Sequence, residues 1–451
     1  MEKDRPQIPD PGNSEIKGEW IESLRTLEHP LGGKESLDPL LDRIGETRIV
    51  LLGEASHGTA EYYTWRHLIS ERLIGEKGFS FIAVEGDWPD CYRVNRYVKG
   101  ATNSGGSARE VLHAFNRWPT WMWANEEVVA LSEWLRRFNE NLPEAERVGF
   151  YGLDVYSLWD SLHAVVEYLN RVDPPAAEVA KEAYRCFEPY GEDVQEYARA
   201  TAFVPASCEA EVVGTLSMLR RKIPAYPDDR EAAFNAEQNA LVAKNAELYY
   251  RTMIRGDTAS WNIRDHHMAD TLDRLIQFHG PTAKAIIWEH NTHIGDARAT
   301  DMSEEGMVNV GQLVRERYGE ENVVLVGFGS YRGSVIAAVA WEAPMEVMPV
   351  PPAAEASWEE ILHRVAPRDR LIVFENVDRL PGNERLYEWR GHRAIGVVYH
   401  PNRERFGNYV PTMMPFRYDA FIYLDETQAL HPLHLQPRAE REPPETYPWA
   451  A

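Results

Sequence analysis

An α/β fold with a mainly parallel central sheet and flanking helices is predicted by three features of this 451-residue sequence. Short apolar runs, each ending in a polar residue, recur five times along the chain. Stretches of helical period separate most of these runs, and residues 157–280 contain no convincing strand. Strands that alternate with helices require right-handed crossovers, so the sheet is expected to be mainly parallel.

The first strand is expected at residues 49–54, IVLLGE, and the first crossover helix follows it. Apolar or aromatic residues at 62, 65, 69 and 73 give that helix its period, and Thr59 is the expected N-cap. Before the strand, residues 16–45 read as short helices. Residues 1–15 are polar with three prolines and are expected to form a disordered arm.

Four more strands end in polar residues at 79–87, 147–154, 283–293 and 322–330. Because the carboxyl ends of parallel strands meet at one edge of the sheet, these polar side chains are expected to gather there, where α/β proteins bind ligands. The runs SVIAAVAW, RLIVFEN, HRAIGVVYH and DAFIYLDET continue the α/β pattern, some of them as antiparallel edge strands.

The expected division of the chain has an α/β core interrupted by helices. Residues 16–156 form its first part, 157–280 a helical insertion with long helices at 231–255 and 258–279, and 281–435 its second part. The insertion is expected to form a lid over the carboxyl ends of the strands. The Pro- and Glu-rich residues 436–451 are expected to be a disordered tail.

Composition limits which ligands, cell compartment and disulfides are expected. The net charge of −23 argues against non-specific nucleic-acid binding and favours a neutral or cationic small ligand. No apolar run is long enough to span a bilayer, and the N-terminus lacks a signal-peptide core, so a cytoplasmic protein is expected. Three widely spaced cysteines without a CxxC motif fit a reducing compartment and predict no disulfide framework. The oligomeric state is not predicted.

The first strand ends in GEASHG, which places Glu54 three residues before His57 in a tight turn. His57 is a candidate general base, and Glu54 would orient the imidazole or stabilise its charge. Arg66 falls on the apolar stripe of the next helix and needs a carboxylate partner, either Glu54 or Glu85. Glu85 ends the second strand and could instead orient water or share a proton with a histidine.

His290 and His293 follow the strand AIIWE with the spacing H-x-x-H. Such a pair could ligate a metal, polarise a carbonyl group or bind an oxyanion. The stretch DHHMAD at 265–270 lies in a helical run and is expected to be a solvated face or a wall. The aromatic run WPTWMW at 118–123 is expected to be either core or the apolar wall of a ligand pocket.

Taken together, GEASHG, Arg66 in YYTWRHLI, AVEGDW, FYGLDVYSLW and WEHNTH resemble the motifs of the erythromycin esterase family, in the family's order, from about residue 20 to about residue 430. The resemblance implies hydrolysis of a macrolide lactone without a covalent intermediate and, in at least some members, without a metal. It puts the general base at His57, the supporting carboxylates at Glu54 and Glu85, the arginine at Arg66 and the paired histidines at His290 and His293. Glu289 and Thr292 depart from the family, whose members often carry smaller residues there.

The sequence therefore predicts a carboxylic ester or lactone hydrolase in which His57 activates water. One alternative is a metal-dependent hydrolase that binds zinc or manganese through Glu54, His57, Glu85, His290 and His293. The other is a non-catalytic protein that binds a small ligand.

Overall fold

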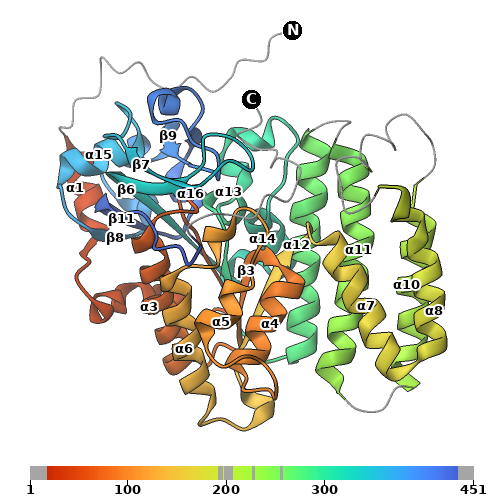
Figure 1. The fold of residues 1–451 in the computed structure, drawn as a ribbon. Helices are drawn as coiled ribbons and strands as arrows, with labels where there is room; N and C mark the ends of the chain where they lie inside the picture. The colour runs from red at the N-terminus through yellow and green to blue at the C-terminus, as the bar shows by residue number, and fades with distance from the viewer. Residues whose placement is uncertain (1–17, 191–196, 198–206, 226–228, 254–256, 435–451) are drawn as a thin grey trace.

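The structure is a computed structural model that describes residues 18–190, 197, 207–225, 229–253 and 257–434. The expected arm at 1–15 lies outside these residues, as does the expected tail at 436–451. The described chain forms a nine-stranded mixed sheet in the order β1-β8-β11-β6-β2-β5-β3-β4, with β7 added to β6. Figure 1 shows the helices arranged around this sheet.

The centre of the sheet is parallel, as the sequence predicts. The parallel strands are β11 (Ala420–Thr427), β6 (Val323–Ala337), β2 (Ile49–Leu52), β5 (Ala285–Trp288), β3 (Phe81–Asp87) and β4 (Gly149–Asp154). The antiparallel strands are β8 (Arg370–Val373), β1 (Glu28–Pro30) and β7 (Glu346–Val350). A separate antiparallel pair joins β9 (Arg390–Arg393) to β10 (Tyr409–Thr412).

Two late runs differ from the expected strands. SVIAAVAW does not form a new strand, because β6 continues through it to Ala337 and pairs with β7 there. HRAIGVVYH is a strand only at its start, where its first residues belong to β9.

Both faces of the parallel sheet are buried, so its strands are apolar throughout rather than alternating with polar residues. Alternate side chains point to opposite faces. Val50, Leu52 and Trp288 belong to one hydrophobic cluster, whereas Leu51 and Ile287 belong to another. Each face therefore has its own core.

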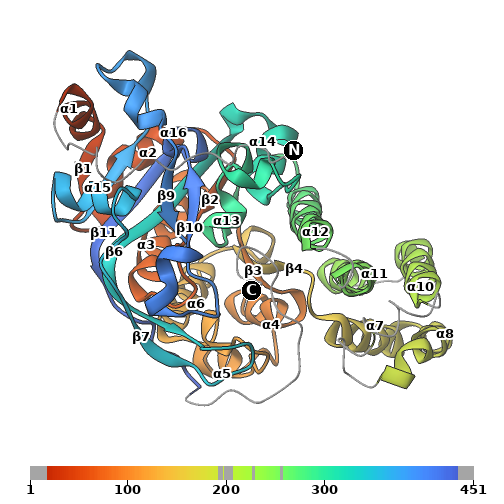
Figure 2. The same ribbon diagram turned by 90° about the horizontal axis from the view of Figure 1, so that it is seen from above.

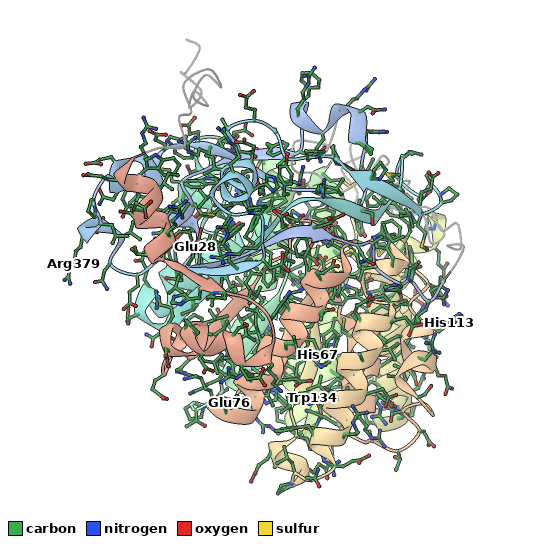
Figure 3. All side chains as sticks on the ribbon, turned by 90° about the vertical axis from the view of Figure 1, so that its left-hand side faces the viewer. Glu28, His67, Glu76, His113, Trp134 and Arg379 are labelled. Atoms are coloured by element: carbon green, nitrogen blue, oxygen red, sulfur yellow. A yellow bond between two sulfur atoms is a disulfide. The ribbon has the colours of Figure 1, made fainter. Side chains whose placement is uncertain are left out.

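The first of these cores is covered mainly by helices α2 to α6. They are α2 (Asp38–Ile44), α3 (Ala60–Lys77), α4 (Trp88–Val98), α5 (Ala108–His113) and α6 (Glu126–Asn139). His67 of α3 lies beside Trp134 of α6, with ring centroids 6.2 Å apart (Figure 3). Thr59 is the N-cap residue of α3, but its hydroxyl contacts the hydroxyl of Ser56 and makes no side-chain capping bond.

The second core is covered by helices from both parts of the chain. They are α1 (Glu19–Thr26), α12 (Asp257–His279), α14 (Val310–Tyr318), α15 (Trp358–Val365) and α16 (Met414–Arg417). A short helix, α13 (Asn291–Ile294), follows β5 directly.

The insertion contains α7 (Leu158–Val172), α8 (Pro174–Tyr184), α10 (Glu209–Lys222), α11 (Arg230–Met253) and α12. Figures 1 and 2 show these helices standing beside the β4 edge of the sheet, with α12 nearest to the strands. The expected lid over the strand ends is not confirmed. None of the described helices combines the length and the apolar character that a membrane span requires.

The prediction that the cysteines form no disulfide framework is wrong, because Cys186 and Cys208 form a disulfide in the insertion. The bond joins the short 3₁₀ segment after α8 to the residue that precedes α10. Cys91 remains a free, buried thiol.

Candidate active site

Strand order explains why the predicted site residues meet. The chain forms β2, then β3 and β4, and then returns to insert β5 between β2 and β3. The segments that follow β2, β5 and β3 are therefore neighbours at the carboxyl edge of the sheet. In an open α/β sheet, such a reversal of strand order opens the crevice where ligands bind.

The segment between β2 and α3 carries Glu54 and His57. It passes very close to β6, since a Cβ on Gly58 would lie 1.9 Å from the carbonyl oxygen of Ile336. Only glycine permits this approach. The turn brings His57 Nδ1 to 2.9 Å from Glu54 Oε1, with both side chains buried.

Arg66 completes this group from α3. Its Nη2 donates to Glu54 Oε2 at 2.6 Å, and the guanidinium lies 4.3 Å from the ring centroid of Tyr63 and 4.7 Å from that of Trp288. Of the two partners expected for Arg66, it therefore bonds Glu54 and not Glu85. With the imidazole in the tautomer that carries its proton on Nδ1, Glu54 accepts hydrogen bonds from both His57 and Arg66. The basic nitrogen of His57 is then Nε2.

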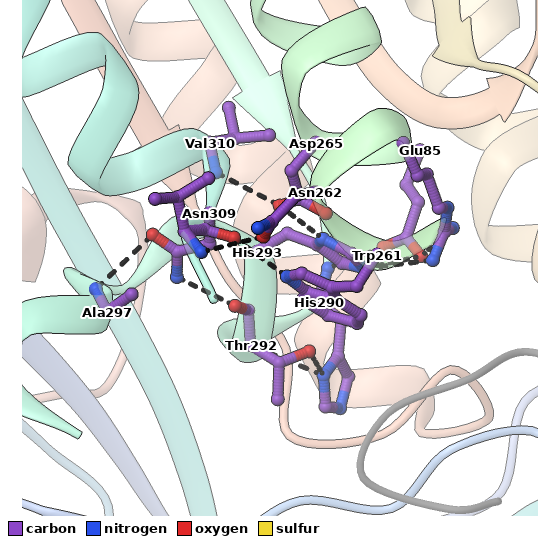
Figure 4. A network of polar contacts seen from close by, with 12 residues as sticks. Glu85, Trp261, Asn262, Asp265, His290, Thr292, His293, Ala297, Asn309 and Val310 are labelled. Atoms are coloured by element: carbon purple, nitrogen blue, oxygen red, sulfur yellow. Dashed lines mark hydrogen bonds and ion pairs between the residues drawn. The ribbon is translucent and has the colours of Figure 1, made fainter. Parts of the chain in front are cut away.

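Glu85 lies where the pairing register of β3 and β4 shifts, between Val84 and Asp87. Such irregularities re-aim side chains near active sites. Glu85 Oε2 accepts the backbone N–H of His290 at 2.8 Å, and Oε1 accepts Arg264 Nη2 at 2.7 Å (Figure 4). Burial raises the pKa of Glu85, but its electrostatic interactions with His293, His57 and Arg264 and the backbone N–H of His290 lower it below its usual range overall. Glu85 is therefore a carboxylate.

Arg264 is a central residue that the sequence did not predict. It extends from α12 and binds Asp154, at the end of β4, through Nε at 3.0 Å and Nη2 at 2.8 Å. Its Nη1 lies 3.1 Å from His293 Nε2. The sequence identifies Asp154 only as a strand end, and Arg264 gives no local signal because its burial depends on contacts with distant strands.

His293 is held by its two ring nitrogens and one ring face. Since a guanidinium only donates, Nε2 of His293 accepts from Arg264, and Nδ1 donates to Asp265 Oδ1 at 2.9 Å. The ring stacks on Trp261 with centroids 4.5 Å apart. DHHMAD is expected from its sequence to be a solvated face or a wall. Asp265 of this stretch is fully buried, so it is not on a solvated face. It belongs to the site, whereas His266 on the same helix is exposed.

His290 differs from His293 in its hydrogen bonds. Its Nδ1 accepts the backbone N–H of Thr292 at 3.3 Å and lies 2.8 Å from the hydroxyl of Thr292 (Figure 4). Burial and the nearby His57 lower the pKa of His290 well below its usual value, so the ring is neutral and its proton is on Nε2. Within the described part of the chain this N–H makes no hydrogen bond of good geometry, although the backbone of Ala55 is close enough to oppose the lowering of the His290 pKa.

The rings of His57 and His290 lie beside each other, with centroids 4.9 Å apart and planes inclined by 44°. The structure thus brings together all six predicted site residues, namely Glu54, His57, Arg66, Glu85, His290 and His293. Each of their side chains is almost fully buried. In such a water-poor setting a fixed donor or charge acts more strongly than it does in solvent.

Glu289, the residue before His290, is buried next to the site. It is 0% exposed, and neither of its carboxyl oxygens has a hydrogen-bond partner among the residues described. Burial, together with the carboxylates of Glu85 and Asp265, raises the pKa of Glu289 well above its usual value. The surroundings of Glu289 therefore favour its neutral, protonated form.

The zinc or manganese site considered from the sequence would have to share two of its ligands, Glu85 and His293, with an arginine. Across the ranges that the structure describes, no three His, Cys, Asp or Glu residues are grouped to hold a metal ion. The Arg264 guanidinium lies between Glu85 and His293, where a metal would have to bind both side chains. Its positive charge disfavours a second cation there.

A pocket opens beside Glu85. Its wall contains Trp118 and Trp123, so the aromatic run is both core and pocket wall. Glu85 and Asp154 belong to the same wall, which joins the pocket to the polar cluster.

Comparisons with known proteins agree with this architecture. The chain is 22% identical to "Erythromycin esterase type II" of Escherichia coli, over 71% of this chain and 78% of that protein. It is 22% identical to the "Putative hydrolase YbfO" of Bacillus subtilis, over 90% of each.

Among solved structures, a succinoglycan biosynthesis protein matches with a TM-score of 0.74 and 21% identity, covering 91% of this chain and 97% of that one. A histidine-to-asparagine mutant of the erythromycin esterase EreC, in its open conformation, matches with a TM-score of 0.65 and 17% identity, covering 88% and 94%. At these identities the structures establish a shared fold.

The family model for erythromycin esterase matches residues 74–427. This range includes Glu85, His290 and His293, whereas Glu54, His57 and Arg66 precede it. The match spans most of the chain, so the protein belongs to the erythromycin esterase family.

Proposed function

We propose that this protein hydrolyses a carboxylic ester or lactone, with the macrolactone of erythromycin-like antibiotics as one candidate substrate. The observation that carries the proposal is the pair of adjacent buried imidazoles, with ring centroids 4.9 Å apart, in which Nδ1 of His57 pairs with Glu54 and Nδ1 of His290 accepts from Thr292. A base and an oxyanion donor are the two groups that water-mediated acyl cleavage needs.

In the proposed reaction, His57 Nε2 takes a proton from water as the water oxygen bonds to the carbonyl carbon. Glu54 stabilises the imidazolium that forms, since it already accepts the Nδ1 proton. The tetrahedral intermediate then expels the alkoxide, which takes the proton from His57. The products are a carboxylic acid and an alcohol, or a hydroxy acid from a lactone.

His290 would stabilise the negative oxygen of the intermediate through its Nε2 proton. Glu85 holds this residue by accepting its backbone N–H, and Thr292 fixes the tautomer by bonding Nδ1. His293 cannot serve as the same kind of donor, because its Nε2 accepts from Arg264. We therefore assign His290 to the oxyanion, and His293 and Arg264 to positioning Glu85.

The first test is His57→Asn, assayed against a panel of aryl esters, lactones and macrolides with mass detection of the added water. Loss of a general base should lower turnover by about a hundredfold or more. The matched control is His67→Asn, because His67 also pairs with a glutamate on α3, at 3.0 Å from Glu71, but lies outside the site. Wild-type rates for His57→Asn would exclude the mechanism.

The proposal also holds that His57 activates the water without a metal. Protein purified without added metal and treated with a chelator should retain its rate. A stoichiometric metal whose removal abolishes turnover would favour the metal-dependent alternative. Tight ligand binding without hydrolysis across the panel would instead favour a binding protein.

A further inference from the structure

The pocket beside Glu85 has an unusual combination of aromatic rings and carboxylates. Its aromatic wall consists of Phe115, Trp118, Trp123, Tyr156 and Trp341. Its acidic wall consists of Glu85, Asp87, Asp90 and Asp154, with Arg117 as the only basic residue among the described lining. The negative charge therefore exceeds the positive charge in the wall itself.

Most of these carboxylates already have a strong partner. Arg264 binds both Glu85 and Asp154, and Arg117 Nε lies 2.5 Å from Asp87 Oδ2. Asp90 is different, because its ion-pair partner is Arg93, at 2.8 Å, whose side chain is 53% exposed. Solvent weakens an ion pair with so exposed a partner. Asp90 is thus the least compensated carboxylate of the pocket.

The charges around Asp90 come from several elements. Arg93 on α4 and Arg117 on the following loop favour its ionised form, whereas Asp160 on α7 disfavours it. Burial is the largest influence and raises the pKa of Asp90 to about 6. At neutral pH the group is therefore a poorly solvated carboxylate, which a bound cation would stabilise.

Two aromatic rings meet in the wall of this pocket. Trp118 and Trp341 lie with centroids 4.3 Å apart and planes inclined by 59°, so they form a corner of the pocket rather than a stack. The Thr120 hydroxyl in the same wall is buried, at 2% exposed, and has no partner among the described residues. An aromatic corner beside a buried carboxylate is the arrangement that recognises ammonium groups.

We propose that this pocket binds a protonated or quaternary amine carried by the substrate. The group would lie against Trp118 and Trp341, with Asp90 as its counter-ion. Because Glu85 belongs both to the pocket wall and to the catalytic cluster, the amine would orient the scissile carbonyl towards His57. This assignment of a substrate class rests on the proposed hydrolase, but binding to the pocket does not depend on turnover.

The test compares choline with its neutral isostere 3,3-dimethylbutan-1-ol by calorimetry at pH 8. The cation should bind about tenfold more tightly, the range expected for a cation on partly desolvated rings. Asp90→Asn and Trp341→Leu should each remove most of this preference. The preference should also decline as the pH falls through 6, where Asp90 takes up a proton.

The matched control is Asp160→Asn, which removes a nearby carboxylate that does not line the pocket and is exposed. It should leave the preference for choline intact. Trp341 is partly exposed, so its variant should fold even if Asp90→Asn does not. Equal affinity for the two ligands would show an apolar pocket and overturn the proposal, as would a preference that survives both variants.

Failure of the hydrolase proposal would look different. In that case His57→Asn and the wild type would both show the preference for choline, and neither would hydrolyse any ester. If both proposals hold, an ester with a tertiary amine should have a lower KM than its neutral carbon analogue. Asp90→Asn should raise that KM with little change in kcat.

Discussion

Glu54 forms hydrogen bonds with both His57, the candidate base, and Arg66. Its Oε1 accepts a hydrogen bond from His57 Nδ1, and its Oε2 accepts one from Arg66 Nη2. The residue is 1% exposed. A buried carboxylate with two donors has little freedom to move, so the imidazole is held in one tautomer. Arg66 acts on His57 only through Glu54 and is therefore a positioning residue.

Glu289 contributes to the pH dependence of stability. Its folded-state pKa lies well above the usual value because of burial and neighbouring carboxylates, while the unfolded chain ionises near pH 4.5. Below that pH both states hold the proton, and the neutral acid does not penalise folding. Above it the unfolded state loses the proton first, so stability falls as the pH rises towards the folded-state pKa.

We expect Glu289→Gln to remove this slope. Between pH 5 and the folded-state pKa, the wild type should lose about 1.4 kcal/mol per pH unit relative to the variant. Urea unfolding at a series of pH values measures the difference. Parallel pH profiles for the two proteins would show that Glu289 is ionised or solvated in the folded state.

Residue-level prediction from the sequence worked where chemistry coincides with a strand end. Glu54, Glu85 and His290 each follow an apolar run, so the topology of the fold is enough to bring them together. Arg264 and Asp265 lie in mid-helix, where the same letters usually mark a solvated face. Only the packing of α12 against the ends of β3 and β4 reveals that they are buried.

Among the elements, β5, β6 and the segment after β2 are joined at Asn291. Its Nδ2 donates to the Phe328 carbonyl at 2.6 Å, its Oδ1 accepts the Phe328 N–H at 3.2 Å, and its own N–H donates to the Glu54 carbonyl at 2.8 Å. Behind it, Nδ2 also contacts His392 Nε2 at 3.2 Å. Asn291 therefore holds the segment that carries His290 against two neighbouring strand ends.

We expect Asn291→Ala to destabilise the protein and to lower turnover. Truncation removes the partners of the Phe328 peptide groups and of His392 Nε2, all of them buried, at a cost of about 1–3 kcal/mol for each group. Denaturant midpoints measure the loss. Asn322→Ala is the control, since Asn322 is half-buried and bonds only locally, to Tyr318 and Glu321. A loss no larger than that of the control would show that Asn291 does not tie the strands together.

Element prediction succeeded for the parallel strands and for the long helices of the insertion. The helices expected at 231–255 and 258–279 are α11 and α12, with ends within two residues of the expected ones. The lid expected over the strand ends is not confirmed, because helical period shows which face of a helix is apolar but not which neighbour covers it. The tertiary contacts of α12 with β4 decide that.

At the level of the whole molecule, Tyr156 contacts both the core of the insertion and an arginine of the site. This residue belongs to a hydrophobic cluster that also contains Phe187 and Cys208. The guanidinium of Arg264 lies 4.8 Å from the Tyr156 ring centroid. The packing of the insertion therefore supports the arginine that holds Glu85 and Asp154.

The Cys186–Cys208 disulfide should stabilise the insertion in particular. Its two cysteines are 22 residues apart, and closing a loop of that length lowers the entropy of the unfolded chain by an amount worth roughly 3 kcal/mol. We expect the Cys186→Ala/Cys208→Ala variant to exchange amide hydrogens faster in α7 and α10, with β2 and β5 unchanged. Thiol titration of denatured wild type should find one thiol, Cys91, rather than three. Three thiols, or unchanged exchange in the insertion, would show that the bond does not form or does not stabilise these helices.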